Sequence, residues 1–363
     1  MKTLNYQSDK DKINEILENR SFEIDDELKK KVKKILDKVK NSGDKALLEL
    51  TSLYDKVDLK DFKVNRYPDA SYKTLRKTYS KLINVDYENL IATNGSDELI
   101  QLIIMTFSKE KDKILALEPT FSEYKKLSEN LGRKYIKVNP KKNLKLNKKL
   151  ALKKIKNENP KVVFLCSPNN PTGELLKKEY IKKVIEITKG IVVLDQAYIE
   201  FYKNELDLDF KNHENLIIMR TLSKAYGLAS LRIGFGIANK NLINKLNKKR
   251  MPFNISGVSN FLAIKLLKEI DLEKTINKIL SQKKIIEKKL DKLHINFLNN
   301  HSKFIILKTN LNEEIVEKAE KNNIQIRTFS DSPLNKYIRF CIGTKNENNK
   351  LIKIIKQVKE NGA

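Results

Sequence analysis

The sequence predicts an α/β protein, in which helices cover a mostly parallel sheet and a smaller α+β domain follows. Between residues 89 and 237, short apolar runs alternate with amphipathic stretches, and this alternation is typical of parallel strands joined by helices. After Arg250 the pattern becomes helical to about Leu293 and then includes two further strand-like segments. A chain of 363 residues has room for one large and one smaller domain.

The order of elements divides the chain into three parts. We expect an N-terminal helical segment at 1–64, a large domain at 65–250 and a small C-terminal domain at 251–363. The expected strands of the large sheet are Asn89–Thr93, Lys113–Leu117, Lys134–Val138, Val162–Cys166, Ile191–Leu194, Leu216–Met219 and Ile233–Ile237. Phe304–Lys308 and Ile338–Ile342 are the strand-like segments of the small domain.

Two helices are expected before the large domain. The first places a set of apolar side chains on one face, namely Leu28, Val32, Ile35, Leu36 and Val39. Asn41–Asp44 then reads as a helix stop followed by a new N-cap. The second helix turns Leu47, Leu50 and Tyr54 inward.

Composition argues against several classes of function. The net charge is +27, but only nine of the 73 basic residues are arginine, and the lysines are spread along the chain without interleaved aromatics, so we expect no nucleic-acid partner. No apolar run reaches 18 residues, and the N-terminus lacks the apolar stretch of a signal peptide, so we expect no membrane span. Cys166 and Cys341 make no disulfide framework, which favours a cytoplasmic protein. The three histidines lack metal-ligand spacing, so no metal site is expected.

A lysine follows one of the expected strands. Leu216–Arg220 runs into Thr221-Leu222-Ser223-Lys224, and Arg232 comes eight residues later. Ligands of open α/β sheets bind at the carboxyl ends of strands, where a lysine can form a Schiff base with an aldehyde cofactor. The hydroxyl neighbours and Arg232 would suit a phosphate. Taken alone, the Ser-Lys pair is weak evidence, because most lysines of such a chain are solvated surface residues.

A carboxylate ends a second strand. Asp195 follows Ile191–Leu194, and Tyr198 comes three residues later. A carboxylate there can keep a pyridine nitrogen protonated, and the Tyr198 hydroxyl can bond a phenolic oxygen. Asp195 could equally be a helix N-cap.

Two further strand ends carry polar loops. Ser167–Gly173 places prolines on both sides of Asn169-Asn170, which makes a rigid loop from which an Asn amide can reach a cofactor oxygen. Asn94–Glu98 opens a helix toward Phe107 and could leave free N–H groups for a phosphate, or could be a plain helix cap.

The order and spacing of these pieces resemble the histidinol-phosphate aminotransferases, a family of fold-type-I pyridoxal-phosphate (PLP) enzymes. The resemblance covers about residues 65–363. Its landmarks, in chain order, are Asn65–Asp69, Asn94–Glu98, Glu118–Phe121, Ser167–Gly173, Asp195–Tyr198, Thr221–Gly227 with Leu231–Gly234, and Tyr337–Arg339 continuing to Gly343-Thr344.

The resemblance implies a role for each matching residue. Lys224 would carry PLP and shuttle a proton, and Asp195 would pair with the pyridine nitrogen. The remaining implied cofactor contacts are Asn170 and Tyr198 at the phenolic oxygen, Ser96, Asp97, Ser223 and Arg232 at the phosphate, Phe121 on the ring, and Tyr67 at the phosphate of a partner subunit. Arg339 and Arg327 would bind the substrate's anionic group.

The implied activity is transfer of an amino group between histidinol phosphate and 2-oxoglutarate by a homodimer. The resemblance also leaves room for aromatic transamination or threonine-phosphate decarboxylation on the same scaffold.

The sequence departs from the family in two places. Gln196 stands where the family usually has Glu. The family's N-terminal Asn-x-Asn-Glu-Asn-Pro-x-Gly pattern is not found, and residues 22–64 instead resemble the N-terminal helices of histidinol dehydrogenase. An in-frame gene fusion would explain this, and we expect such a chain to be impaired or an inactive remnant. The alternative is that two ordinary surface helices match by accident.

Overall fold

The computed structural model describes residues 26–55, 65–202, 209–330 and 333–361. The chain forms two compact units, Met1–Lys63 and Val64–Ala363, which are described separately.

The first unit contains α2 (Asp26–Asp55), which is two helices joined at Gly43. Gly43 has φ 50° and ψ −133°, a conformation that glycine adopts without a steric penalty. The predicted break at Asn41–Asp44 is therefore confirmed. Lys38 Nζ lies 2.9 Å from Glu49 Oε2, which brings the two halves side by side. The side chains of Leu28 and Tyr54 lie outside the described residues.

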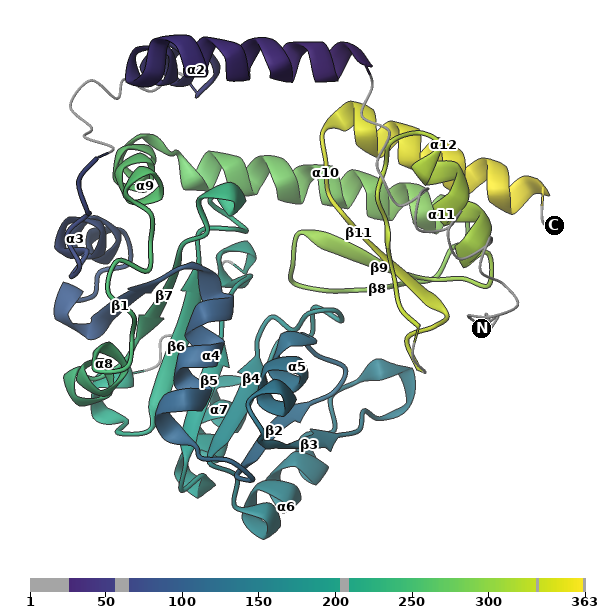
Figure 1. Ribbon diagram of the computed structural model, residues 1–363. Helices are drawn as coiled ribbons and strands as arrows, with labels where there is room; N and C mark the ends of the chain where they lie inside the picture. The colour runs from purple at the N-terminus through teal and green to yellow at the C-terminus, as the bar shows by residue number, and fades with distance from the viewer. Residues whose placement is uncertain (1–25, 56–64, 203–208, 331–332, 362–363) are drawn as a thin grey trace, which may run out of the picture. The chain divides into compact units, whose positions relative to one another are not determined.

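The second unit is built on a seven-stranded sheet of order β1-β7-β6-β5-β4-β2-β3 (Figure 1). Its strands are β1 (Leu90–Thr93), β2 (Lys113–Leu117), β3 (Lys134–Val138), β4 (Val162–Cys166), β5 (Ile191–Asp195), β6 (Leu216–Thr221) and β7 (Gly234–Ile237). β3, β2, β4, β5 and β6 pair in parallel, whereas β7 runs antiparallel to both β6 and β1. The prediction of a mostly parallel sheet is confirmed, with strand ends within a few residues of those expected.

Helices cover both faces of this sheet because its strands alternate two sets of apolar side chains. In β4, Val163 and Leu165 enter one core with α3, α6, α7 and α9, whereas Val162 and Phe164 enter the other with α4, α5 and α8. The helices are α3 (Lys73–Leu82), α4 (Gly95–Phe107), α5 (Glu123–Asn130), α6 (Lys148–Glu158), α7 (Lys178–Ile187), α8 (Lys240–Asn247) and α9 (Gly257–Glu269). Short 3₁₀ helices lie at Tyr87–Asn89, Lys142–Leu144, Ile199–Phe201, Phe210–Asn212 and Ala229–Leu231.

The C-terminal part folds around a four-stranded antiparallel sheet of order β10-β11-β9-β8. Its strands are β8 (Phe297–Leu298), β9 (Phe304–Lys308), β10 (Arg327–Thr328) and β11 (Tyr337–Cys341), and its helices are α10 (Leu272–Lys292), α11 (Asn312–Glu320) and α12 (Lys345–Asn361). Phe304, Ile306 and Tyr337 pack against Tyr198 and Phe201, so one side of this sheet faces the loop after β5.

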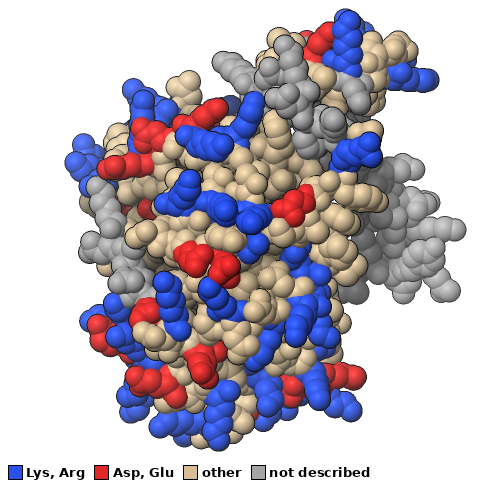
Figure 2. Space-filling model, turned by 90° about the vertical axis from the view of Figure 1, so that its left-hand side faces the viewer, with Lys and Arg blue, Asp and Glu red and all other residues tan. Residues whose placement is uncertain are grey.

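The surface carries charges of both signs. On the face shown in Figure 2, lysine and arginine lie among acidic and uncharged side chains. In the part of the chain that the structure describes, no helix is long and apolar enough to cross a membrane.

Candidate active site

Three neighbouring parallel strands bring the predicted residues together. β4, β5 and β6 are adjacent, and β4 pairs with β5 through Cys166 and Asp195 at their carboxyl ends. The carboxyl ends of parallel strands share one edge of a sheet, so the loops after these strands start beside one another. Those loops carry Asn170, Tyr198 and Lys224.

Asp195 is the buried carboxylate at this edge. Its side chain is 4% exposed, and its oxygens accept hydrogen bonds from the Ala197 N–H at 2.9 Å and the Tyr124 hydroxyl at 2.5 Å. Burial raises the pKa of Asp195, and the Tyr124 and Ala197 hydrogen bonds oppose this. The 3₁₀ helix that follows has Tyr198 at its N-cap, so Asp195 does not cap it.

Lys224 extends over the aromatic ring of Tyr198, with Nζ 5.5 Å from the ring centroid. Burial lowers the pKa of Lys224, the positive charge of Lys303 lowers it further, and Asp195 acts in the opposite direction. A lowered pKa increases the neutral fraction of the amine, which is the nucleophilic form. The effect of Asp195 on Lys224 shows that the two side chains lie close enough to interact electrostatically.

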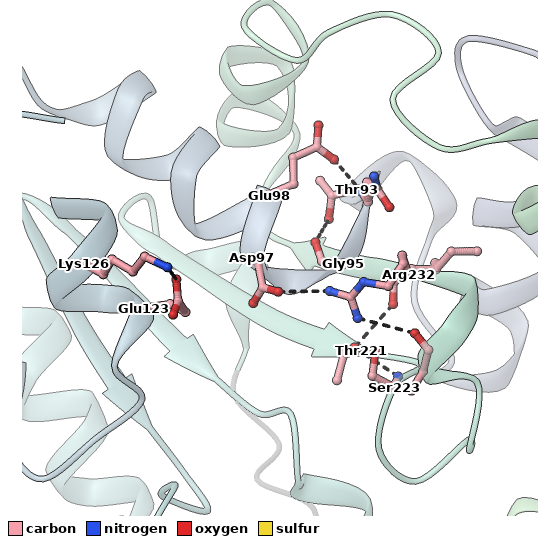
Figure 3. A network of polar contacts seen from close by, with 12 residues as sticks. Thr93, Gly95, Asp97, Glu98, Glu123, Lys126, Thr221, Ser223 and Arg232 are labelled. Carbon is pink, nitrogen blue, oxygen red and sulfur yellow. Dashed lines mark hydrogen bonds and ion pairs between the residues drawn. The ribbon is translucent and has the colours of Figure 1, made fainter. Parts of the chain in front are cut away.

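A cradle forms where α4 starts beside β7 (Figure 3). Arg232 Nη2 lies 3.0 Å from Asp97 Oδ2, and both side chains are about half exposed. A Cβ on Gly95 would come within 2.7 Å of the Arg232 guanidinium, and one on Gly234 within 2.6 Å of the Ser96 nitrogen. Glycine at position 95 therefore leaves room for the Arg232 guanidinium, and glycine at position 234 leaves room for the start of α4 beside β7.

The remaining predicted phosphate contact, Ser223, lies in the turn after β6. The Ser223 N–H donates to Thr221 Oγ1 at 3.1 Å, which fixes the turn after β6 (Figure 3). The α4 N-cap, Asn94, makes no side-chain capping bond, and its N–H instead donates to the Glu98 carboxylate. Neither Ser96 nor Asp97 is therefore the N-cap residue of this helix.

The two neighbouring asparagines of the Ser167–Gly173 loop have different environments. Asn169 is buried and bonds the Pro119 carbonyl at 2.8 Å and the Thr172 hydroxyl at 2.9 Å, so it braces two loops. Asn170 instead accepts a hydrogen bond from Arg339 Nη1 across the junction between the sheets. The structure thus joins Asn170 to the predicted substrate arginine.

Arg339 lies in β11 directly opposite Arg327 in β10. The Arg339 guanidinium stacks over Phe304 at 5.2 Å, and its Nε is buried without a hydrogen-bond partner among the described residues. Two like charges directly opposite each other on neighbouring strands are unfavourable unless an anion compensates them. The pair is therefore suited to an anionic ligand.

The two predicted aromatic contacts, Phe121 and Tyr67, differ in how far they are buried. Phe121 is partly buried, with its ring edge-on to Tyr124 at 5.7 Å. Tyr67 is 82% exposed and stacks on Phe253 at 4.6 Å, and no contact joins it to the residues above among those the structure describes.

Sequence reasoning missed Tyr124 and Lys303, the neighbours that bear on Asp195 and Lys224. Tyr124 could have been marked as a buried tyrosine three residues after Phe121, but no pattern indicates that its hydroxyl meets Asp195. Gln196, which directly follows Asp195, is fully buried, and its amide oxygen accepts a hydrogen bond from the buried Arg220 at 2.8 Å.

Comparison with known proteins gives a consistent result. The family model described as aminotransferase class I and II matches residues 30–355. A histidinol-phosphate aminotransferase of Clostridium novyi is 36% identical over 299 residues, which is 82% of this chain and 84% of that protein. One of Methanocaldococcus jannaschii is 33% identical over 317 residues, 84% of each.

Solved structures confirm the predicted fold-type-I architecture. The histidinol-phosphate aminotransferase of Clostridium acetobutylicum is 26% identical with a TM-score of 0.74, and the match covers 82% of this chain and 92% of that one. The enzyme of Sinorhizobium meliloti, solved in complex with pyridoxal 5′-phosphate, has a TM-score of 0.77 at 22% identity over 83% and 84% of the two chains. The chain therefore belongs to the class I and II aminotransferases, in the family of the histidinol-phosphate aminotransferases.

Proposed function

We propose that this protein transfers an amino group between histidinol phosphate and 2-oxoglutarate, with PLP bound to Lys224, as a cytoplasmic step of histidine biosynthesis. The observation that carries the proposal is that Asn170, Asp195 and Lys224 follow three adjacent parallel strands at one edge of the sheet. The chain's relatives at 33–36% identity are named histidinol-phosphate aminotransferases.

The cradle between α4 and β7 fits the cofactor's phosphate. Gly95 and Gly234 leave space that a Cβ would fill, beside the Arg232 guanidinium at Gly95 and beside the Ser96 nitrogen at Gly234. Asp97 holds the guanidinium at 3.0 Å. Ser223 would add its hydroxyl from the turn after β6, which its own N–H stabilises by donating to Thr221 Oγ1. When bound, PLP supplies an aldehyde carbon that bonds amines and a ring that withdraws electrons.

The residues at the strand ends would orient the cofactor's ring. Asp195 would hold a proton on the pyridine nitrogen, since a buried carboxylate stabilises a nearby cation strongly. Asn170 and Tyr198 would bond the phenolic oxygen, and Phe121 would cover one face of the ring.

Lys224 would also move the proton. Once a substrate amine has replaced Lys224 on the cofactor, the Lys224 Nζ would be free to accept the proton from the substrate's reacting carbon. The lowered pKa of Lys224 favours this role, because a protonated amine cannot act as a base.

Arg339 and Arg327 would bind the anionic group of the substrate. The planar guanidinium pairs with phosphate or carboxylate oxygens through two parallel hydrogen bonds. Because Arg339 also contacts Asn170, substrate binding and cofactor orientation would share one contact.

A homodimer is part of the proposal, with Tyr67 reaching the phosphate of the partner subunit. Tyr67 is 82% exposed, and Met251, Phe253 and Val258 are 70%, 41% and 37% exposed. Met251, Phe253 and Val258 are close in sequence, and the Phe253 ring stacks on that of Tyr67. Exposed apolar side chains of this kind mark a surface that another chain can cover.

A substrate panel tests the proposal. The PLP-loaded protein is assayed with 2-oxoglutarate and histidinol phosphate, with phenylalanine and with threonine phosphate, and kcat/KM is compared. We expect histidinol phosphate to be preferred, and Arg339→Met to reduce that preference by roughly 10²-fold through loss of a charged pair. A preference for phenylalanine, or release of carbon dioxide from threonine phosphate, would assign the chain to another reaction of the same scaffold.

A further inference from the structure

Tyr124 is a fully buried residue in the first turn of α5, at the edge of the candidate site. Its ring stacks on Phe164 with centroids 4.5 Å apart and an interplanar angle of 7°. Phe121 meets it edge-on at 5.7 Å and 88°. Two aromatic neighbours at different angles leave the ring little freedom to rotate or shift.

The hydroxyl of this fixed ring lies 2.5 Å from Asp195 Oδ2. The other oxygen, Oδ1, accepts the Ala197 N–H at 2.9 Å. Donors on both oxygens define the plane of the carboxylate, and each donor comes from a buried part of the chain.

We infer that Tyr124 is a positioning residue that holds the Asp195 carboxylate in place for the cofactor's ring nitrogen. The inference rests on the proposed function, since it assigns to Tyr124 an effect on the cofactor that acts through Asp195.

The physical reason is the cost of keeping a carboxylate ionised away from water. Burial raises the pKa of Asp195, and hydrogen bonds to the charged form lower it. Burial also raises the pKa of Tyr124 well above its ordinary value, so this hydroxyl remains a donor throughout the working pH range. The other titratable groups that influence Asp195 in its surroundings are Lys224, Asp97, Cys166 and Tyr198.

Without the Tyr124 hydroxyl, Asp195 would compete more strongly for the proton on the ring nitrogen. The ring would then carry less positive charge and withdraw electrons less well. A weaker positive charge on the ring would repel less strongly the proton on the nitrogen that joins the cofactor to Lys224. The pKa of that nitrogen would therefore rise.

Tyr124→Phe tests this, because it removes only the hydroxyl and keeps the ring packing. Tyr135→Phe is a matched control: the Tyr135 hydroxyl donates to Glu118 Oε1 at 2.5 Å, in a tyrosine–carboxylate pair away from Asp195. Each protein is loaded with PLP, and the absorbance of the bound cofactor is titrated with pH alongside measurement of kcat.

We expect Tyr124→Phe to move the absorbance midpoint to higher pH and to lower kcat on the order of tenfold, as for loss of a hydrogen bond to a charged group. Tyr135→Phe should leave both unchanged. The inference is overturned if Tyr124→Phe leaves the absorbance midpoint and kcat unchanged, or if Tyr135→Phe shifts the midpoint as much as Tyr124→Phe does.

The same substitution in an Asp195→Asn background separates positioning from general stability. An amide carries no charge for Tyr124 to hold, so Tyr124→Phe should then have no further effect on the midpoint. An undiminished effect would show that Tyr124 acts through the fold and not through Asp195. If the wild-type protein does not take up PLP at all, the proposed function fails, whereas normal uptake with an unresponsive Tyr124→Phe variant refutes this inference alone.

Discussion

The two central residues of the site are buried groups whose pKa values shift in opposite directions. Burial raises the pKa of Asp195 and lowers that of Lys224, because each group loses the water that stabilises its charged form. Neighbours then correct or extend these shifts: Tyr124 lowers the pKa of Asp195, and Lys303 lowers that of Lys224 further. Such perturbed groups converging in one place are typical of catalytic sites.

Asp195→Asn should reduce turnover far more than cofactor binding. The amide keeps the shape of the side chain but cannot stabilise a protonated ring nitrogen, which should lower kcat about 10²-fold or more. Equilibrium binding of PLP and kcat are measured on the same preparation. Near wild-type turnover in this variant would refute the assignment of Asp195.

Lys303→Met should raise the pKa of Lys224. A positive neighbour disfavours the charged amine, so its removal leaves less neutral Lys224 at any pH below that pKa. The rate of covalent PLP capture by the cofactor-free protein, followed against pH, should therefore have its midpoint at higher pH. Lys308→Met, the same change at an exposed position of β9, is the control. Equal midpoints in all three proteins would contradict the predicted influence of Lys303.

At the residue scale, the sequence indicated candidate side chains but not the contacts that those side chains make. Lys224 and Asp195 could be found because each directly follows an apolar strand, and such positions share an edge in a parallel sheet. Sequence reasoning could not predict that Asn169 turns inward while Asn170 meets Arg339, since both occupy the same loop. Nor could it place Tyr124, whose partner is 71 residues away.

At the scale of elements, the cradle depends on how closely β7 approaches the start of α4. β7 contributes two glycines, and the position of Gly234 leaves no room for a side chain against the backbone of Gly95 and Ser96. The close approach lets Arg232, at the entrance to the strand, reach Asp97 on the helix.

Gly234→Ala should weaken PLP binding. Its Cβ would lie 2.6 Å from the Ser96 nitrogen, so the start of α4 would have to shift away from the phosphate. We expect the dissociation constant to rise roughly 10-fold to 10²-fold, as for loss of one or more hydrogen bonds to a charged group.

Gly236→Ala is the matched control on the same strand. Its Cβ would meet the side chains of Ile91 and Leu99, not backbone, so it tests the cost of a methyl group in β7 without touching the cradle. A similar loss of PLP affinity in both variants, measured by equilibrium titration, would contradict a specific role for Gly234.

The long apolar strands could be predicted almost to the residue, because buried parallel strands are continuous apolar runs bounded by turns. The two-residue strands β8 and β10 were not predicted, since so short a segment has no periodicity. The antiparallel direction of β7 was also not predicted, because strand direction depends on how its connections cross the sheet.

At the scale of the whole molecule, the chain carries an apolar surface whose proposed occupant is a second copy. Tyr67 and Phe253 stack on each other, and Met251 is 70% exposed nearby in sequence. Phe253 also adopts φ 55°, an unusual conformation for a bulky residue. Strained and exposed residues together favour a functional surface over an accidental one.

Met251→Asp should weaken the homodimer, because an unpaired carboxylate would be buried when two copies meet. We expect the dissociation constant, measured by sedimentation equilibrium, to rise at least about tenfold. Ile285→Asp, at an exposed position of α10, should leave it unchanged. A wild-type protein that sediments as a monomer would refute the proposed dimer.

Lys224 is the residue to which PLP is proposed to bind covalently. Reduction of the PLP-loaded protein with borohydride fixes the covalent linkage, and peptide mapping by mass spectrometry then locates it. We expect a single modified peptide with the adduct on Lys224, and its loss in Lys224→Ala. An adduct on another of the chain's many lysines, or no adduct, would contradict it.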